Sequence, residues 1–111
     1  KVAIGQDSHR IDYTNTDKKL VLGGVKFEED FSIVANSDGD VVLHAITNAI
    51  SGITCKNIIG KVSDDMCKKG IINSEEYLKE ALKYLDNQIV HLSISIECRR
   101  NEKKYGKNIG N

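Results

Sequence analysis

The sequence predicts a small single α/β domain of mixed strands and helices, in the α+β sense. Two observations predict this class. Along the chain the hydrophobic pattern changes between strand-like alternation and helical spacing, so strands and helices are mixed. The chain has 111 residues, of which 40% are hydrophobic, enough for one domain with a limited core. We therefore expect one domain over residues 1–111, with further stability from association between copies.

The first third of the chain is expected to form a strand and a hairpin. Residues 2–4 are a short apolar run that leads to a bend containing Gly5. Two apolar runs, residues 20–22 and 25–27, flank the pair Gly23 and Gly24. Adjacent glycines between such runs indicate a two-residue hairpin turn, which requires positive φ.

A helix is predicted from Ser37 to Ile53, with Ser37 or Asp38 as its N-cap. One helical stripe is apolar: Val42, Ile46, Ala49, Ile50 and Ile53. A second face carries polar side chains: Asp40, His44, Thr47 and Ser51. The stripe predicts that one side of this helix packs on the core.

The second half contains another helix and another strand. A helix is predicted over residues 74–87, with the Ser74 hydroxyl as its cap. Strict alternation over residues 90–98 predicts a strand with one buried and one polar face. The intervening residues 55–73 are expected to form a loop, and the polar residues 101–111 are expected to be mobile.

Charge and cysteine content exclude several functional classes. Lys plus Arg and Asp plus Glu are both 16, so no net field recruits nucleic acid or a membrane surface, and any phosphate binding must be local. No apolar stretch reaches the length of a membrane span, and no targeting segment is visible. Three widely spaced cysteines indicate neither a disulfide framework nor a thiolate cage, which favours a reducing compartment.

The most informative residues are Asp7, His9 and His44. Asp7 and His9 are two apart, so on an extended segment they point the same way, and His44 approaches from the predicted helix. Three N/O ligands with room for a fourth are what a catalytic zinc requires. The alternative is that a lone histidine on a helix is a hydrogen-bonded partner. His91, on the polar face of its strand, is expected to lie outside the site.

The two aspartates near the start of the first helix allow two compatible interpretations. Asp38 and Asp40 fit best as helix caps or first-turn acids, and a role in orienting a metal-bound histidine is the alternative. With Asn36 they also imitate the oxygen spacing of a calcium loop. Gly39 is misplaced for such a loop and Thr47 stands where a bidentate acid is needed, so we reject the EF-hand.

Three segments carry a resemblance to a known family: residues 2–10, residues 20–25 and the Ser37-to-Ala45 run SDGDVVLHA. Their order and spacing resemble the 2-C-methyl-D-erythritol 2,4-cyclodiphosphate synthases of non-mevalonate isoprenoid biosynthesis. The resemblance is good over the first half of the chain and thins beyond Ile53. It implies a phosphorus–oxygen lyase that cyclises 4-diphosphocytidyl-2-C-methyl-D-erythritol 2-phosphate to the cyclic diphosphate and releases CMP.

The resemblance also implies architecture, cofactors and site residues. The family fold is a mixed sheet with helices on one face, assembled as a homotrimer with active sites between subunits. Asp7, His9 and His44 would bind zinc, whose open position accepts a substrate phosphate oxygen, and a second divalent ion, magnesium or manganese, would bridge the diphosphate. The implied substrate-binding positions are Ser8, Asn36, Ser37, Ile58, Ile59, Gly60, Ser63, Asp64 and Asp65.

Several positions depart from the family pattern. Asn36 replaces the histidine thought to position the phosphates, and Ile58 stands at the position of the aspartate that holds the methylerythritol hydroxyls, with Asn57 as the nearest polar residue. No Thr-Thr-Glu-Lys segment is present, so the second ion has no recognisable ligand and the family's C-terminal segment is not found. The alternative function is therefore a metal-binding, trimer-forming homologue without turnover. The Lys-, Asn- and Ile-rich composition fits a bacterium, with a cytoplasmic enzyme, or a parasite with a plastid.

Overall fold

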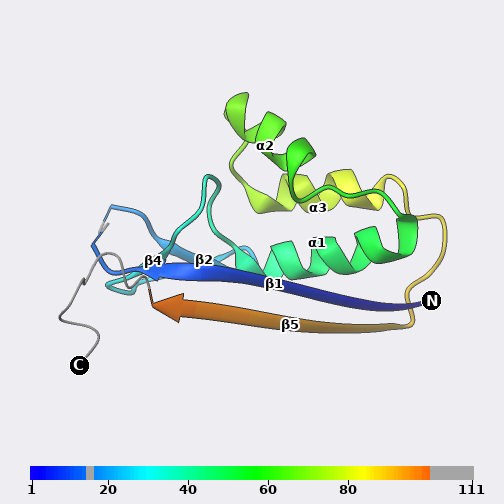
Figure 1. Ribbon diagram of the computed structural model, residues 1–111, viewed down its shortest axis with the longest axis horizontal. Coiled ribbons are helices and arrows are strands. Elements are labelled where there is room, and N and C mark those ends of the chain that lie inside the picture. The colour runs from blue at the N-terminus through cyan, green and yellow to red at the C-terminus, as the bar shows by residue number, and fades with distance from the viewer. Residues whose placement is uncertain (15–16, 101–111) are drawn as a thin grey trace.

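The computed structural model describes residues 1–14 and 17–100, and Figure 1 shows a sheet with all three helices on one side. The sheet has the order β4-β1-β5. β4 (Ser32–Ile33) runs antiparallel to β1 (Val2–Asp12), whereas β5 (His91–Arg100) runs parallel to it. The predicted mixed sheet with helices on one face is therefore confirmed. Residues 101–111, which we expected to be mobile, lie outside the described residues.

The predicted bend at Gly5 is wrong, because β1 continues through this residue to Asp12. Gly5 instead allows a close approach between layers. A Cβ atom at this position would lie 2.0 Å from the carbonyl oxygen of Ala45 and 2.7 Å from Cβ of Ala49. Glycine is needed here for packing, since α1 (Val41–Thr54) lies directly against β1.

The predicted hairpin is confirmed. β2 (Leu20–Leu22) pairs antiparallel with β3 (Val25–Phe27), and the turn residues Gly23 and Gly24 have φ of 62° and 82°. The helix that follows was expected to begin at Ser37 but begins at Val41, and its N-cap is Asp40 rather than Ser37 or Asp38. The Asp40 side chain accepts a hydrogen bond from the Leu43 amide at 3.0 Å. The Asp40 carboxylate also accepts hydrogen bonds from the amides of Gly23 and Gly24 in the hairpin turn.

Polar side chains of α1 are buried as well as part of its apolar stripe: Ala49 and Ile50 are buried, whereas Val42, Ile46 and Ile53 are half-buried. β1 covers one side of the helix and α3 covers another (Figure 1). His44 and Thr47 of α1 and the N-cap residue Asp40 are all buried. The Thr47 hydroxyl meets its hydrogen-bonding need within the helix by donating to the Leu43 carbonyl at 2.7 Å.

The predicted loop over residues 55–73 is wrong in part, because it contains α2 (Lys61–Lys68). The turn into α2 is held locally, since the Gly60 amide donates to the Ser63 hydroxyl at 3.0 Å. The next helix, α3 (Ser74–Leu82), is shorter than predicted and is capped by Asn73 rather than Ser74. The buried cluster between the three helices contains Ile50, Ile58, Tyr77 and Ala81.

The predicted buried face of β5 is only half covered. Leu92, Ile94 and Ile96 are 41%, 40% and 44% exposed, although the register with β1 turns them toward the helix layer. β5 is an edge strand, so side chains on its outer side have no neighbouring strand beside them. Among the described residues no helix is both long and apolar enough to cross a bilayer.

Candidate metal centre

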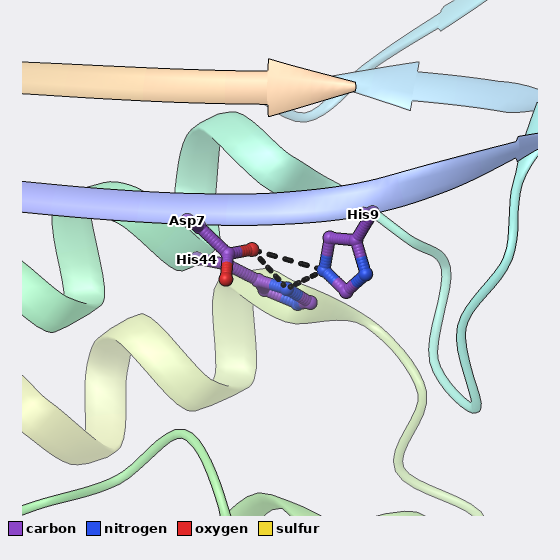
Figure 2. A group of neighbouring side chains, drawn as sticks. All are labelled: Asp7, His9 and His44. Atoms are coloured by element: carbon purple, nitrogen blue, oxygen red, sulfur yellow. Dashed lines mark hydrogen bonds and ion pairs between the residues drawn. The ribbon is translucent and has the colours of Figure 1, made fainter. Parts of the chain in front are cut away.

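The candidate site lies between β1 and α1. Asp7 and His9 share one face of β1, because they are two apart on a strand. This is the face that turns toward α1. His44 reaches them from the start of α1, whose closeness to β1 depends on Gly5. Figure 2 shows the three side chains converging. The structure thus brings together all three predicted metal ligands.

The three converging atoms form a small triangle. Asp7 Oδ2 lies 2.9 Å from His9 Nε2 and 3.3 Å from His44 Nδ1. The two nitrogens are 3.1 Å apart. Ligands at roughly 2.0–2.1 Å from a tetrahedral zinc lie about 3.3 Å from one another, so the triangle has nearly the size of one tetrahedral face. The donor set and its spacing therefore fit a zinc ion with one further coordination position.

The electrostatics of the triangle also favour a cation. The side chains of Asp7, His9 and His44 are only 14%, 21% and 6% exposed. Asp7 Oδ2 is buried and, among the described residues, has no polar partner apart from these two imidazoles. Burial acts to raise the pKa of Asp7, but hydrogen bonds and positive charge from His44 and His9 outweigh it and lower the pKa to about 2. A carboxylate and two ring nitrogens this close require a proton or a metal ion between them.

A cavity of about 300 Å³ opens beside the two histidines. Its lining includes eight of the residues predicted for the site: His9, Asn36, Ser37, His44, Ile59, Gly60, Ser63 and Asp64. They come from β1, the segment before α1, α1 itself, the turn that leads into α2, and the first part of α2. Because the cavity adjoins the ligand triangle, a molecule bound in it would lie next to a metal held there.

A family model described as the YgbB family matches residues 1–108. The chain belongs to the YgbB family. Among curated relatives it is 48% identical over 103 residues to a protein of Chlamydia trachomatis serovar A and 50% identical over 103 residues to one of Chlamydia muridarum. Both are named 2-C-methyl-D-erythritol 2,4-cyclodiphosphate synthase, so the resemblance found in the motifs is confirmed.

The matches cover 90% of this chain but 58% of each of these two relatives, so this YgbB-family chain spans little more than half of their length. A solved structure of a 2C-methyl-D-erythritol-2,4-cyclodiphosphate synthase, in a bound form with CDP, has a TM-score of 0.60 to this chain. The two share 20% sequence identity, and 85% of each chain is covered. The likeness shows that the fold is that of these synthases.

Three of the residues predicted for substrate binding lie outside the cavity in the described part of this YgbB-family chain. Ser8 is exposed on the opposite face of β1 from Asp7 and His9, beside Glu97 of β5. Asp65 forms an ion pair with Lys61 at 3.0 Å on the surface of α2. Ile58 is 2% exposed and belongs to the core cluster, so its side chain is not available to a ligand.

Asp38 and Asp40 support the site without reaching the ligand atoms. Asp40 joins the hairpin turn to α1, as described above. Asp38 accepts hydrogen bonds from the amide and the hydroxyl of Ser74. The Ser74 hydroxyl in turn lies 2.8 Å from His44 Nε2, so Asp38 is connected to His44 through Ser74.

The sequence analysis missed three side chains of the site. Cys67 and Tyr77 line the cavity, where the Cys67 thiol donates to the Asn36 carbonyl at 3.1 Å and the Tyr77 ring centre lies 6.1 Å from that of His44. Ser74 was interpreted as a helix cap. Cys67 and Tyr77 could be placed at the cavity only once α2 and α3 are known. No sequence signal links Ser74 to His44, since 30 residues separate them.

Proposed function

We propose that this protein is a zinc-dependent lyase that cyclises 4-diphosphocytidyl-2-C-methyl-D-erythritol 2-phosphate to 2-C-methyl-D-erythritol 2,4-cyclodiphosphate and releases CMP, in non-mevalonate isoprenoid precursor synthesis. The observation that carries the proposal is the triangle of Asp7, His9 and His44 beside a cavity, in a chain 48–50% identical to synthases of that name. The reaction requires charge neutralisation and alignment of two phosphates, and a metal beside a pocket provides both.

Asp7, His9 and His44 would hold the zinc, and the bound ion would act as a Lewis acid on a phosphate oxygen of the substrate. The carboxylate of Asp7 makes such a site less positive than one with three histidines. The residues of the chain would then bind and orient the substrate within the cavity and keep water from the reacting phosphorus.

The segment before α1 would contribute hydrogen bonds to phosphate. Asn36 and Ser37 line the cavity, and the Ser37 hydroxyl accepts a hydrogen bond from the Gly39 amide at 3.2 Å, which leaves its own proton free to donate. The amides of Asp38 and Asp40 are engaged within the fold, so an anion cradle made of backbone amides at this place is not supported. Side chains would therefore donate the hydrogen bonds to phosphate, and Asn36 would position phosphate as a neutral donor.

The remainder of the substrate would contact the second wall of the cavity. We propose Ile59, Gly60, Ser63 and Asp64 for the methylerythritol portion, since these residues line the same space. For Ser8, Ile58 and Asp65 a role in substrate binding would require contacts through the backbone or from a second copy. We also propose a second divalent ion, magnesium or manganese, with ligands not found in this chain. The compartment, bacterial cytoplasm or plastid, stays a prediction.

We further propose that the protein works as a homotrimer with active sites shared between subunits. The half-exposed apolar side chains of β5 support association, since covering Leu92, Ile94 and Ile96 would remove apolar surface from water. A cavity open to one side would be completed by a neighbouring subunit, which is also where cytidine would find its partners.

The alternative function is a metal-binding, trimer-forming homologue without turnover. Two observations favour it: the family's phosphate-positioning histidine is replaced by Asn36, and Ile58, at the position of the family's hydroxyl-binding aspartate, is buried in the core. Losing one electrostatic contact to the transition state typically costs about 3 kcal/mol in the barrier, so two such changes are enough to abolish measurable turnover.

CMP release distinguishes the two functions. The 111-residue chain is compared with a form extended by the Thr-Thr-Glu-Lys segment of the family, each with and without zinc. We expect both to bind zinc, and only the extended form to release CMP above background. Zinc binding with no CMP release from the extended form would favour the alternative, and equal rates from the two forms would contradict the need for that segment.

A further inference from the structure

We propose that Ser74 is a positioning residue of the metal centre: its hydroxyl connects His44 to Asp38 and holds the imidazole so that Nδ1 is offered to the metal. The proposal rests on the metal-binding part of the proposed function. It assigns a role to the first residue of α3, which is neither one of the three candidate ligands nor part of the cavity lining but contacts the far side of the His44 ring.

Both nitrogens of the His44 ring have defined surroundings. Nδ1 faces the triangle, 3.1 Å from His9 Nε2 and 3.3 Å from Asp7 Oδ2. Nε2 faces the other way and lies 2.8 Å from the Ser74 hydroxyl. The Ser37 hydroxyl is a second neighbour of Nε2 but lies at 3.5 Å, so Ser74 is the stronger partner. A single partner at good distance can therefore decide which nitrogen carries the proton.

The direction of the hydrogen bonds follows from Asp38. A carboxylate only accepts hydrogen bonds, and Asp38 Oδ1 contacts the Ser74 hydroxyl directly, so the hydroxyl proton is donated to Asp38. The serine oxygen is then left as an acceptor for His44, which must carry its proton on Nε2. The lone pair of Nδ1 consequently points at the ligand triangle, which is the form of histidine that binds a metal.

The connection is rigid because Asp38 is held from several sides. The Asp38 amide donates to the Ile72 carbonyl at 2.9 Å, and Asp38 Oδ2 accepts from the Ser74 amide at 3.0 Å. Oδ1 also accepts from the Asp40 amide at 3.1 Å. Ser74 is 0% exposed, so water has no ready access to replace its hydroxyl. The position of the first turn of α3 is thus coupled to the orientation of a metal ligand.

The first test measures zinc affinity of the intact protein by competition with a chromogenic chelator. Replacing a residue that orients a metal-binding histidine typically weakens metal binding about 10- to 100-fold, and we expect a loss in this range for Ser74→Ala. The matched control is Ser51→Ala, because the Ser51 hydroxyl oxygen is also buried but has no hydrogen-bond partner in the part of the chain that the structure describes. A change of less than twofold in Ser74→Ala would overturn the proposal.

The second test reads the tautomer directly and does not depend on a variant that folds. The ¹⁵N shifts of the His44 ring in metal-free wild-type protein, at a mildly alkaline pH, should show the proton on Nε2. Ser74→Ala should show a mixture of tautomers, whereas Ser51→Ala should match wild type. A proton on Nδ1 in the wild type would overturn the role of Ser74 even if zinc binds. Absence of zinc binding with the Nε2 tautomer retained would instead contradict the proposed function and leave the hydrogen-bond chain standing.

Discussion

The carboxylate of Asp40 accepts a hydrogen bond from the Gly24 amide at 2.6 Å, and this contact joins the turn of the β2–β3 hairpin to the start of α1. The other oxygen of Asp40 accepts from the Gly23 amide at 2.8 Å and the Leu43 amide at 3.0 Å. One buried side chain therefore satisfies three amides from two elements. The placement of His44, one turn further along α1, depends on this junction.

Replacing Asp40 with alanine should lower the free energy of unfolding by about 2–4 kcal/mol, because a helix cap is lost and buried amides are left without partners. Chemical denaturation followed by circular dichroism measures the change. Asp86→Ala is the control, since Asp86 is exposed, and it should change stability by no more than about 0.5 kcal/mol. Similar stability for both variants would refute the role given to Asp40.

Replacing His44 with alanine should weaken zinc binding far more than replacing His91. His44 supplies one corner of the ligand triangle, whereas His91 is exposed on β5 and contacts the Ser93 hydroxyl at 2.8 Å. Isothermal titration of the metal-free proteins with zinc provides the measurement. Equal losses in the two variants would reject the assignment of the ligands.

Two glycines provide a matched test of the contact between β1 and α1. Gly5→Ala should destabilise the protein by about 3 kcal/mol, because the added Cβ would overlap the Ala45 carbonyl oxygen and push α1 away from the strand. Gly52→Ala, in α1 itself, meets no atom within 4 Å and should be neutral or stabilise by up to about 1 kcal/mol. Thermal unfolding of both variants measures these effects.

Zinc affinity extends the comparison, since movement of α1 also carries His44 away from Asp7 and His9. Gly5→Ala should therefore bind zinc more weakly, while Gly52→Ala should bind like wild type. A stable Gly5→Ala protein with unchanged affinity would show that α1 is not held in place by this contact.

Stability at high pH should depend on Tyr77. Burial of the phenol, with the Cys67 thiol beside it, raises the pKa of Tyr77 from its ordinary value of 10.0 to about 12. Between these two pKa values the unfolded chain binds fewer protons than the folded one, so the free energy of unfolding falls as pH rises through this window. Below the window the ionisation of Tyr77 adds no pH dependence to the free energy of unfolding. The hydroxyl also donates to the Ile71 carbonyl at 2.6 Å, which favours the protonated form.

Denaturation at a series of alkaline pH values tests this expectation. Tyr77→Phe should show a shallower decline between about pH 10 and pH 12 than wild type. The exposed Tyr84 is the control position, and Tyr84→Phe should keep the wild-type slope. An unchanged slope in Tyr77→Phe would contradict the raised pKa.

Association should be visible in solution at micromolar concentration. A core of this size and the half-exposed apolar residues of β5 both favour burial of more surface, so light scattering should give a mass near three times that of the chain. Ile94→Lys should shift the mass toward the monomer, whereas Lys83→Ala, which alters an exposed surface position of the helical layer, should leave it unchanged. A stable wild-type monomer would argue against a shared active site.

Elements whose signals are local can be predicted from the pattern of residues. The glycine pair predicts the hairpin because only residues tolerant of positive φ form so tight a turn. The spacing of Asp7 and His9 predicts a common direction because a strand repeats every two residues. The helical stripe predicts α1, and the three candidate metal ligands are recognised because their residue types suit zinc.

Features that depend on residues far apart in the chain become visible only in the folded protein. Gly5 is conformationally ordinary, and its importance arises from Ala45 and Ala49 lying against it. Ser74 carries a helix-capping signal in sequence but is used by His44 and Asp38, which precede it by 30 and 36 residues. Buried polar groups accept whichever partner folding brings within reach, and that choice is made by packing between layers rather than by the local pattern of residues.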